Sequence, residues 1–190
     1  ICEELRQGTT LLKKLGIEPK SLVTLNEHNE KEFASELAMR MINGESFALI
    51  SDAGTPVFAD PGAQLVELAL SYGVKVVPVP GASSLMAALS CLDIKLENFY
   101  YAGFLPRDPD KRRLELFRLK NMRTAIVVLD TPYRLNALLQ DAVKSFGRQR
   151  NALIAMDISL PTELIVRGTL EELKAAASGR KSEFVLIIYP

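Results

Sequence analysis

The stretch Phe47-Ala-Leu-Ile-Ser-Asp-Ala-Gly-Thr-Pro-Val-Phe-Ala-Asp-Pro-Gly62 and the residues that follow it decide the expected fold. Residues 47–51 form a short, continuous apolar run, which is typical of a strand covered on both faces of a parallel sheet. After the turn-rich loop, residues 63–72 have helical spacing and Gly73 ends that helix. A second apolar run covers 74–79. Strand, helix and strand over this distance predict a βαβ unit with a right-handed crossover.

The rest of the chain extends this α/β pattern into two lobes. We expect helices at about 9–15, 29–43 and 84–91, then strands at 99–103, 125–129, 151–157, 163–168 and 183–189 with helices at 112–120, 134–146 and 169–177. The pattern loosens between 93 and 98. The sequence therefore predicts lobes 1–97 and 98–190, each a mostly parallel or mixed sheet flanked by helices.

Composition describes an ordinary folded protein. Of 190 residues, 48% are apolar, and 23 Lys and Arg balance 23 Asp and Glu, so any contact with nucleic acid must rest on a local patch. Cys2 and Cys91 lie far apart without metal-ligand spacing, which fits a reducing compartment. No run of about 18 apolar residues spans a membrane and no signal segment opens the chain, which favours the cytoplasm. Because the chain starts within what reads as the end of a strand, we expect a front strand before Ile1.

Two loops that follow predicted strands are the candidate ligand site. Residues 52–62 and 80–84 both lie where open α/β sheets bind ligands, so both are expected to face one crevice. Gly54 and Gly62 allow close approach of a ligand to the backbone, while the prolines stiffen the loops. Amides after residue 80 favour an anionic group. The alternative is that both are simply tight strand-to-helix turns.

Other familiar sites are not supported. The chain has neither a G-x-G-x-x-G fingerprint nor a G-x-x-x-x-G-K-[ST] loop. His28 is the sole histidine, so it cannot build a multi-histidine metal site or a histidine-relayed triad, and we expect no metal.

A compact group of cations follows the strand expected at 99–103. It consists of Arg107, Lys111, Arg112 and Arg113. Arginine forks match phosphate oxygens, so this group is a candidate for binding phosphate. The alternative is a solvated helix face whose charge is offset by neighbouring aspartates and glutamates.

The loop Leu49–Gly62 closely resembles the donor-binding loop of the tetrapyrrole (corrin/porphyrin) methylase superfamily. The resemblance runs from Ile1 to the end of the chain, in the family's order. Its other segments are Glu27-His-Asn-Glu30, Val77-Pro-Val-Pro-Gly81, Gly103-Phe-Leu-Pro106, Lys111-Arg-Arg113, Thr131-Pro-Tyr-Arg134 and Glu183-Phe-Val-Leu-Ile187. Thr55 stands where tetrapyrrole enzymes typically carry aspartate. This favours the branch that methylates a ribose 2′-oxygen of a cytidine in small-subunit ribosomal RNA.

The resemblance implies a homodimeric, two-lobed methyltransferase that takes S-adenosylmethionine as methyl donor. Its implied donor-binding residues are Asp52, Ala53, Gly54, Thr55, Pro56, Ser83, Ser84, Leu129, Asp130, Thr131, Ser182, Glu183 and Phe184. Arg107, Lys111, Arg112 and Arg113 are the implied contacts to ribosomal RNA or the small ribosomal subunit.

No general base is fixed by the sequence. A ribose hydroxyl has a high pKa and benefits from one, and Glu3, Glu4 and Asp52 are candidates, although each also fits a helix-start or turn role. Two other functions stay open: methylation of a tetrapyrrole or other small molecule, and a non-catalytic S-adenosylmethionine-binding homologue.

Overall fold

The computed structural model describes residues 1–18, 21–52 and 54–190, and the chain divides into two compact units, Ile1–Ser83 and Ser84–Pro190. The predicted Ala53 contact lies outside the described residues. The boundary differs from the lobe boundary expected after residue 97. The reason is that Leu85 and Ala88, together with the partly buried Leu92 and Ile94, pack into the second unit's core.

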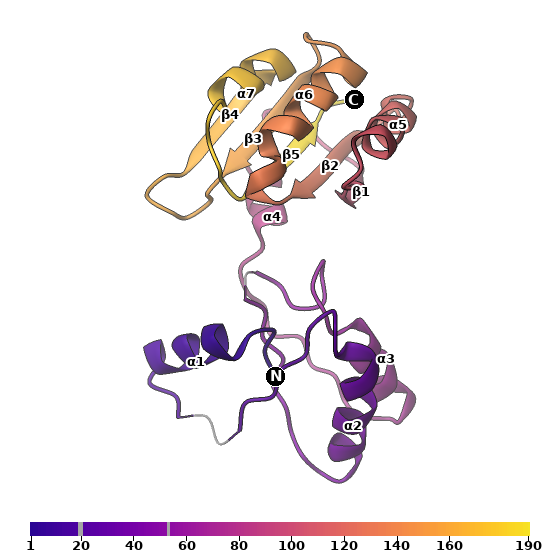
Figure 1. Ribbon diagram of the computed structural model, residues 1–190, viewed down its shortest axis with the longest axis vertical. Helices are drawn as coiled ribbons and strands as arrows, with labels where there is room; N and C mark the ends of the chain where they lie inside the picture. Colours follow the sequence, from indigo (N-terminus) through magenta and orange to yellow (C-terminus); the bar gives the residue numbers. More distant parts are fainter. Residues whose placement is uncertain (19–20, 53) are drawn as a thin grey trace. The chain divides into compact units, whose positions relative to one another are not determined.

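The second unit is a five-stranded mixed sheet with helices on both faces (Figure 1). Its elements are α4 (Ser84–Leu89), β1 (Phe99–Phe104), α5 (Pro109–Lys120), β2 (Ala125–Asp130), the 3-10 turn η1 (Pro132–Arg134), α6 (Leu135–Phe146), β3 (Asn151–Met156), β4 (Leu164–Thr169), α7 (Leu170–Ala176) and β5 (Phe184–Ile188). The strand order is β1-β2-β5-β3-β4, with β1 parallel to β2 and the other neighbouring pairs antiparallel.

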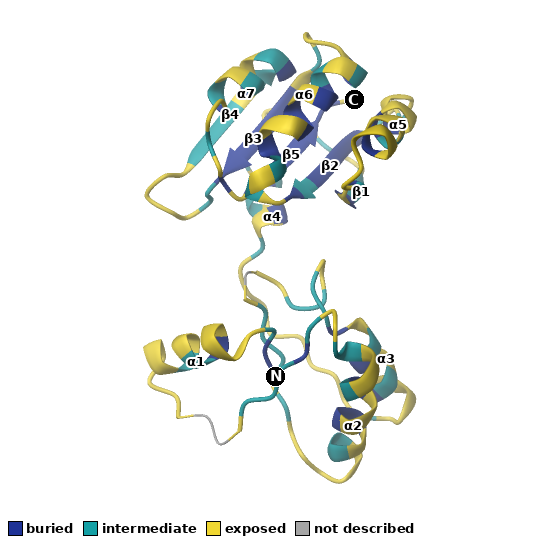
Figure 2. Cartoon of the chain, in the orientation of Figure 1, coloured by how far each residue is buried: buried dark blue, intermediate teal, exposed yellow. Residues whose placement is uncertain are grey.

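Alternation along the central strands divides the core of this unit into two layers. Ile126 and Val128 of β2 face the layer formed with α5, α6 and α7, whereas Val127 faces the layer formed with α4. Figure 2 shows β2, β3 and β5 as the most buried part of the unit. Burial on both faces explains why these strands read as continuous apolar runs rather than alternating ones.

The first unit contains the helices α1 (Leu5–Lys14), α2 (Glu30–Ile42) and α3 (Ala63–Ser71). Leu37 of α2 and Leu65 of α3 are buried in one small core together with Leu25. Ile1 and Cys2 lie between two other segments: Ile50 N donates to Ile1 O at 2.9 Å, and Leu25 N donates to Cys2 O at 2.9 Å.

The two strands expected in the first lobe are not formed. Among the described residues, 47–51 contact the two-residue segment Ile1–Cys2, which is too short for a ladder, and only an isolated bridge joins Cys2 to Thr24. The run 74–79 has no ladder partner in the described part of the chain, and its Val79 is 89% exposed. An apolar run predicts that a segment is suited to a sheet, but a strand also needs a neighbouring strand in the same sheet to hydrogen-bond with.

Candidate functional site

The 51–62 loop has an unusual backbone. Gly54 and Gly62 have φ of 86° and 126°, which glycine adopts easily, but Val57 and Ala59 also have positive φ, at 71° and 65°. For a β-branched residue such as Val57 this is a true outlier, and each such residue costs of the order of 1–3 kcal/mol. A conformation of this kind persists only where its surroundings hold it.

Three side chains hold the loop. Ser51 Oγ donates to Asp60 Oδ2 at 2.6 Å across the base of the loop. Glu30 Oε1 accepts from the amides of Gly62 and Gln64, both at 2.9 Å. Thr55 Oγ1 donates to Ala82 O at 3.2 Å. The loop is therefore fixed at its base, at its end and at its middle by separate contacts.

The Thr55–Ala82 bond brings the two candidate loops side by side, as the sequence predicts. A Cβ added at Gly54 meets no atom within 4 Å, and one at Gly81 meets only Val79 O at 4.0 Å. Exposed backbone on two adjacent loops is a surface that a flat or extended small molecule can lie against. The residues present therefore fit S-adenosylmethionine at the first-unit positions Asp52, Gly54, Thr55, Pro56 and Ser83.

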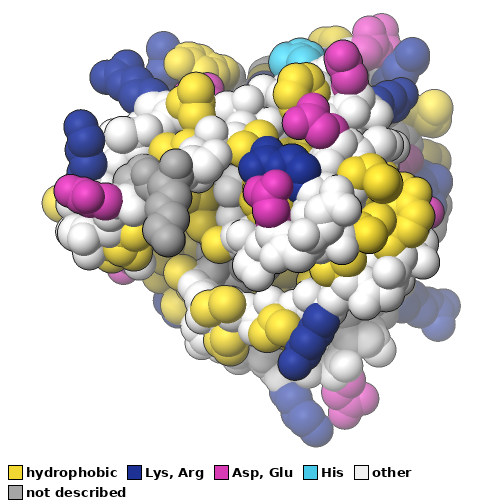
Figure 3. Space-filling model, turned by 90° about the horizontal axis from the view of Figure 1, so that it is seen from below, with side chains coloured by type: hydrophobic (Ala, Val, Ile, Leu, Met, Phe, Trp, Pro, Cys, Tyr) yellow, Lys and Arg dark blue, Asp and Glu magenta, His cyan; other side chains and the backbone are white. Residues whose placement is uncertain are grey.

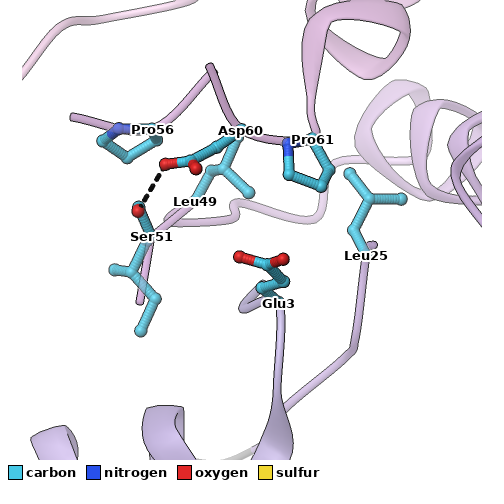
Figure 4. A pocket seen from close by; sticks show the side chains of 8 residues that line it. Glu3, Leu25, Leu49, Ser51, Pro56, Asp60 and Pro61 are labelled. Carbon is cyan, nitrogen blue, oxygen red and sulfur yellow. Dashed lines mark hydrogen bonds between the residues drawn. The ribbon is translucent and has the colours of Figure 1, made fainter. Parts of the chain in front are cut away.

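A small pocket opens beneath this loop (Figure 4). It is lined by Glu3, Leu25, Leu49, Ile50, Ser51, Pro56, Asp60 and Pro61. The Glu3 carboxylate points into it, below the hydrogen-bonded Ser51 and Asp60. Burial raises the pKa of Glu3, and the negative charges of Asp52 and Asp60 raise it further.

The three candidate bases lie in different environments. Glu3 is half-buried in the pocket, and Asp52 is exposed and near enough to raise the pKa of Glu3. Glu4 is exposed at the start of α1, where its side chain makes no capping hydrogen bond. His28 is exposed beside Glu27, in keeping with the surface role expected of it.

The second-unit donor residues predicted from the resemblance come together at one end of the sheet. Leu129 pairs with Val185 and Asp130 with Phe184 across the β2–β5 ladder, so Leu129–Thr131 and Ser182–Phe184 lie next to each other. The side chains of Asp130, Ser182 and Phe184 are buried. Only backbone atoms of those three residues are therefore suited to touch a ligand, whereas Thr131, Glu183 and Ser84 are exposed.

The four residues of the cationic group differ in burial, and the expectation that Arg112 contacts RNA is wrong. Arg112 is 5% exposed and donates from Nε and Nη2 to Asp141 Oδ2 at 2.9 and 2.6 Å, so it is not available to RNA. Arg113 is exposed and pairs with Asp110, while Arg107 and Lys111 are exposed. Three of the four predicted cations therefore remain at the surface.

The buried Arg112 and the partly buried Arg134 hold the loop after β1, a role that their sequence positions did not predict. Arg134 Nη2 donates to Leu105 O at 2.8 Å and to Pro106 O at 2.7 Å, and Arg112 Nη1 donates to Arg107 O at 3.3 Å. Three consecutive carbonyl groups are thus bound by two guanidinium groups. Only Arg112 carried a sequence signal for this role, because it lies in α5 at a position that faces the core.

Asp130 supplies a prediction about pH. Its Oδ1 accepts from Thr131 N at 2.8 Å and lies 3.2 Å from Arg134 Nη1, but its buried Oδ2 has no hydrogen-bond partner among the described residues. Burial raises the pKa of Asp130 despite the arginines nearby. The folded state therefore holds the proton at pH values where the unfolded state, with a pKa of about 3.9, has released it.

It follows that this group lowers stability as pH rises from the unfolded pKa through the raised folded pKa. We expect Asp130→Asn to gain stability relative to wild type as pH rises through that window, because the amide cannot ionise. Urea unfolding at pH 4 and pH 7 measures the difference, with the exposed Asp110→Asn as control. A wild type that gains on the variant between these two pH values contradicts the prediction.

Comparison with known proteins identifies the family of this chain. The family profile described as Tetrapyrrole (Corrin/Porphyrin) Methylases matches residues 3–174, which include the whole 51–62 loop. The chain belongs to the tetrapyrrole methylase family. The predicted family and its enzyme class, that of S-adenosylmethionine-dependent methyltransferases, are confirmed.

Curated relatives extend the match along the whole chain. Ribosomal RNA small subunit methyltransferase I of Xylella fastidiosa (strain Temecula1) is 39% identical over 193 residues, covering 99% of this chain and 70% of the relative. The protein of the same name from Neisseria meningitidis serogroup A is 38% identical over 195 residues, covering 100% of this chain and 66% of the relative. The chain thus spans about two thirds of the length of such relatives.

Two solved structures of similar proteins confirm the predicted fold of this tetrapyrrole methylase. Uroporphyrin-III C-methyltransferase from Thermus thermophilus, complexed with S-adenosylhomocysteine, superposes with a TM-score of 0.62 at 20% identity, covering 93% of this chain and 80% of that one. The cobalt precorrin-4 methyltransferase CbiF gives a TM-score of 0.62 at 18% identity, covering 92% and 77%. At such identities the likeness establishes the fold alone.

Two further observations concern the residues that the structure describes. No helix among them is long and apolar enough to cross a membrane. Nor do three or more His, Cys, Asp or Glu side chains within 1–18, 21–52 and 54–190 gather in a way that would hold a metal ion.

Proposed function

We propose that this tetrapyrrole methylase transfers a methyl group from S-adenosylmethionine to small-subunit ribosomal RNA, at the ribose 2′-oxygen of a cytidine. The observation that carries the proposal is the 38–39% identity, over nearly the whole chain, to proteins named ribosomal RNA small subunit methyltransferase I. Thr55 at the middle of the 51–62 loop supports the same branch. We also propose that the protein acts as a homodimer in the cytoplasm.

S-adenosylmethionine supplies a methyl group on a positively charged sulfur, which is a good leaving group. The chain's own task is therefore alignment, exclusion of water and removal of one proton. The exposed backbone at Gly54 and Thr55 and the adjoining 80–84 loop hold the donor. Their stiffness reduces the conformational freedom lost on binding.

Glu3 is the proposed proton acceptor. Its carboxylate points into the pocket beneath the 51–62 loop, and burial together with Asp52 and Asp60 raises its pKa. A carboxylate with a raised pKa is a stronger base than an exposed one, as removal of a ribose hydroxyl proton requires. Glu4 is exposed outside the pocket and is not assigned this role.

RNA contact is assigned to the exposed cations Arg107, Lys111 and Arg113. Since the chain's net charge is zero, only such local groups can attract phosphate. On the face seen in Figure 3, Lys and Arg side chains are scattered among hydrophobic and acidic ones, so that face offers no continuous basic surface.

Calorimetric titration with S-adenosylhomocysteine is the first test. We expect saturable binding that is lost in the double variant Asp52→Ala, Thr55→Arg, because the variant removes the Thr55 Oγ1 bond that joins the two loops and places a long side chain on the proposed donor surface. NAD titrated in parallel should give no binding. Failure of wild type to bind S-adenosylhomocysteine would overturn the assigned donor site.

The acceptor is tested with labelled donor. We expect label to enter small-subunit RNA and the modified linkage to resist alkali, since a methylated 2′-oxygen cannot attack its phosphate. Charge reversal at Arg107, Lys111 and Arg113 should weaken this transfer and leave affinity for S-adenosylhomocysteine unchanged. Label entering only a tetrapyrrole would assign the small-molecule function, and binding without transfer to either acceptor would indicate a non-catalytic homologue.

A further inference from the structure

We infer that Glu30 is a positioning residue for methyl transfer: from α2 it caps α3 and thereby sets the 51–62 loop in the conformation that receives the donor. This inference rests on the proposed donor site. Glu30 itself does not line the pocket, and it belongs to α2, whereas the loop leads into α3.

The first turn of α3 has no capping side chain of its own. Its N-cap residue is Gly62, which has no side chain to accept the free amides of the first turn. A side chain at Gly62 is disfavoured, because φ is 126° and an added Cβ meets Leu49 Cδ2 at 2.8 Å, so that the leucine side chain must shift. Asp60, two residues earlier, already accepts from Ser51.

Glu30 supplies the missing cap from elsewhere in the sequence. One oxygen, Oε1, accepts from Gly62 N and Gln64 N, both at 2.9 Å, which are the N-cap and second amides of α3. A carboxylate there also complements the positive end of the helix dipole. Hydrogen bonds to a charged group are stronger than neutral ones, so this contact ties the loop's last residue to α2.

Glu30 is in turn held in place by the turn before α2. Asn26 N donates to Asn29 Oδ1 at 2.7 Å, Asn29 Nδ2 donates to Thr24 O at 3.3 Å, and His28 N donates to Asn26 Oδ1 at 3.1 Å. This turn orients the first residue of α2, which is Glu30. The segment Glu27–Glu30 thus has a defined task that does not require His28 to act as a base.

The consequence for the site follows from the strain in the loop. Val57 and Ala59 hold costly positive φ values that persist only while both ends of the loop are fixed. The Ser51–Asp60 bond fixes the base and the Glu30 contacts fix the end. Without Glu30 the loop can adopt conformations of lower free energy. Binding of the donor must then order the exposed backbone at Gly54 and Thr55 again, which lowers the affinity.

The experiment compares Glu30→Ala, Glu30→Gln and the control Glu32→Ala. Glu32 is an exposed acid in the first turn of the same helix. We expect Glu30→Ala to weaken binding of S-adenosylhomocysteine by about tenfold and to speed amide exchange at Gly62 and Gln64. Glu30→Gln keeps an accepting oxygen and should restore most of both, while Glu32→Ala should change neither.

The outcomes separate this inference from the proposed function. Glu30→Ala that folds, binds S-adenosylhomocysteine as wild type does and keeps slow exchange at Gly62 and Gln64 would overturn the inference and leave the donor site intact. Reduced stability with unchanged affinity would overturn it as well, since it reduces Glu30 to a structural cap. Wild type that binds no S-adenosylhomocysteine refutes the donor site, while exchange still decides whether Glu30 holds the loop.

Discussion

Asp141→Ala is expected to destabilise the chain by about 3–5 kcal/mol, a large part of the roughly 5–15 kcal/mol that stabilises a folded protein. Asp141 Oδ2 accepts from Nε and Nη2 of Arg112, and both side chains are almost completely buried. Removing the carboxylate leaves the buried guanidinium charge between α5 and α6 without an opposite charge in hydrogen-bond contact, and among the described residues only the Arg107 carbonyl still accepts from it. Because the chain has no tryptophan, circular dichroism during urea unfolding is the suitable measurement.

Two comparisons make this prediction specific. Arg113→Ala breaks an exposed pair with Asp110 on the same helix and should cost less than about 1 kcal/mol. The double variant Arg112→Met, Asp141→Leu replaces both charges by apolar groups and should recover most of the loss, because the buried charge is gone. An Asp141→Ala variant no less stable than Arg113→Ala would contradict the account.

The buried pair also changes how an RNA role must be tested. A charge reversal at Arg112 would reduce methylation by disrupting the fold, so its effect says nothing about phosphate contact. Arg107, Lys111 and Arg113 are exposed and can be changed without that consequence. The sequence shows that Arg112 belongs to a cluster of cations. It does not show that the Arg112 side chain points inward, because that depends on Asp141, which lies 29 residues later.

The second unit could be predicted from sequence almost completely because its signals are local. The apolar run at Ala125–Leu129 is a central strand, and the helices expected at 112–120, 134–146 and 169–177 are present as α5, α6 and α7. The first unit was predicted less well. Runs 47–51 and 74–79 have the composition of strands, but pairing depends on partners elsewhere, and no pattern within a run reports whether they are present.

The candidate site divides in the same way. The two loops were identified from their glycines and prolines, and the Thr55–Ala82 bond confirms that they adjoin. Glu30 was not identified, because its partners Gly62 and Gln64 lie 32 and 34 residues away. Asp130 was expected to contact a ligand, but its side chain is turned into the protein by a partner, Arg134, that the spacing does not reveal.

Gly62→Ala is expected to cost about 1–3 kcal/mol and to weaken binding of S-adenosylhomocysteine. Two effects add: alanine is strained at a φ of 126°, and its Cβ would lie 2.8 Å from Leu49 Cδ2 and 3.2 Å from Val57 Cγ2. Relief requires Leu49 or Val57 to move. Both belong to the loop region, since Leu49 lines the pocket with Glu3 and Val57 carries the positive φ.

Gly73→Ala separates the two effects. Gly73 ends α3 with a φ of 75°, but a Cβ there meets nothing within 4 Å, so this control carries backbone strain of about 1 kcal/mol without overlap. Urea unfolding and calorimetry on both variants measure the difference. If Gly62→Ala is no more damaging than Gly73→Ala, close packing at the start of α3 is not what requires the glycine.

A second substitution tests whether the contact with Leu49 causes the loss of stability. Leu49→Ala in the Gly62→Ala background removes the atom nearest to the new Cβ and should recover stability relative to the sum of the two single changes. Recovered stability with recovered binding would mean that the packing of Leu49 under Gly62 shapes the donor surface. Recovered stability without binding would place that requirement in the backbone angle of Gly62 itself, which Glu30 holds through the Gly62 amide.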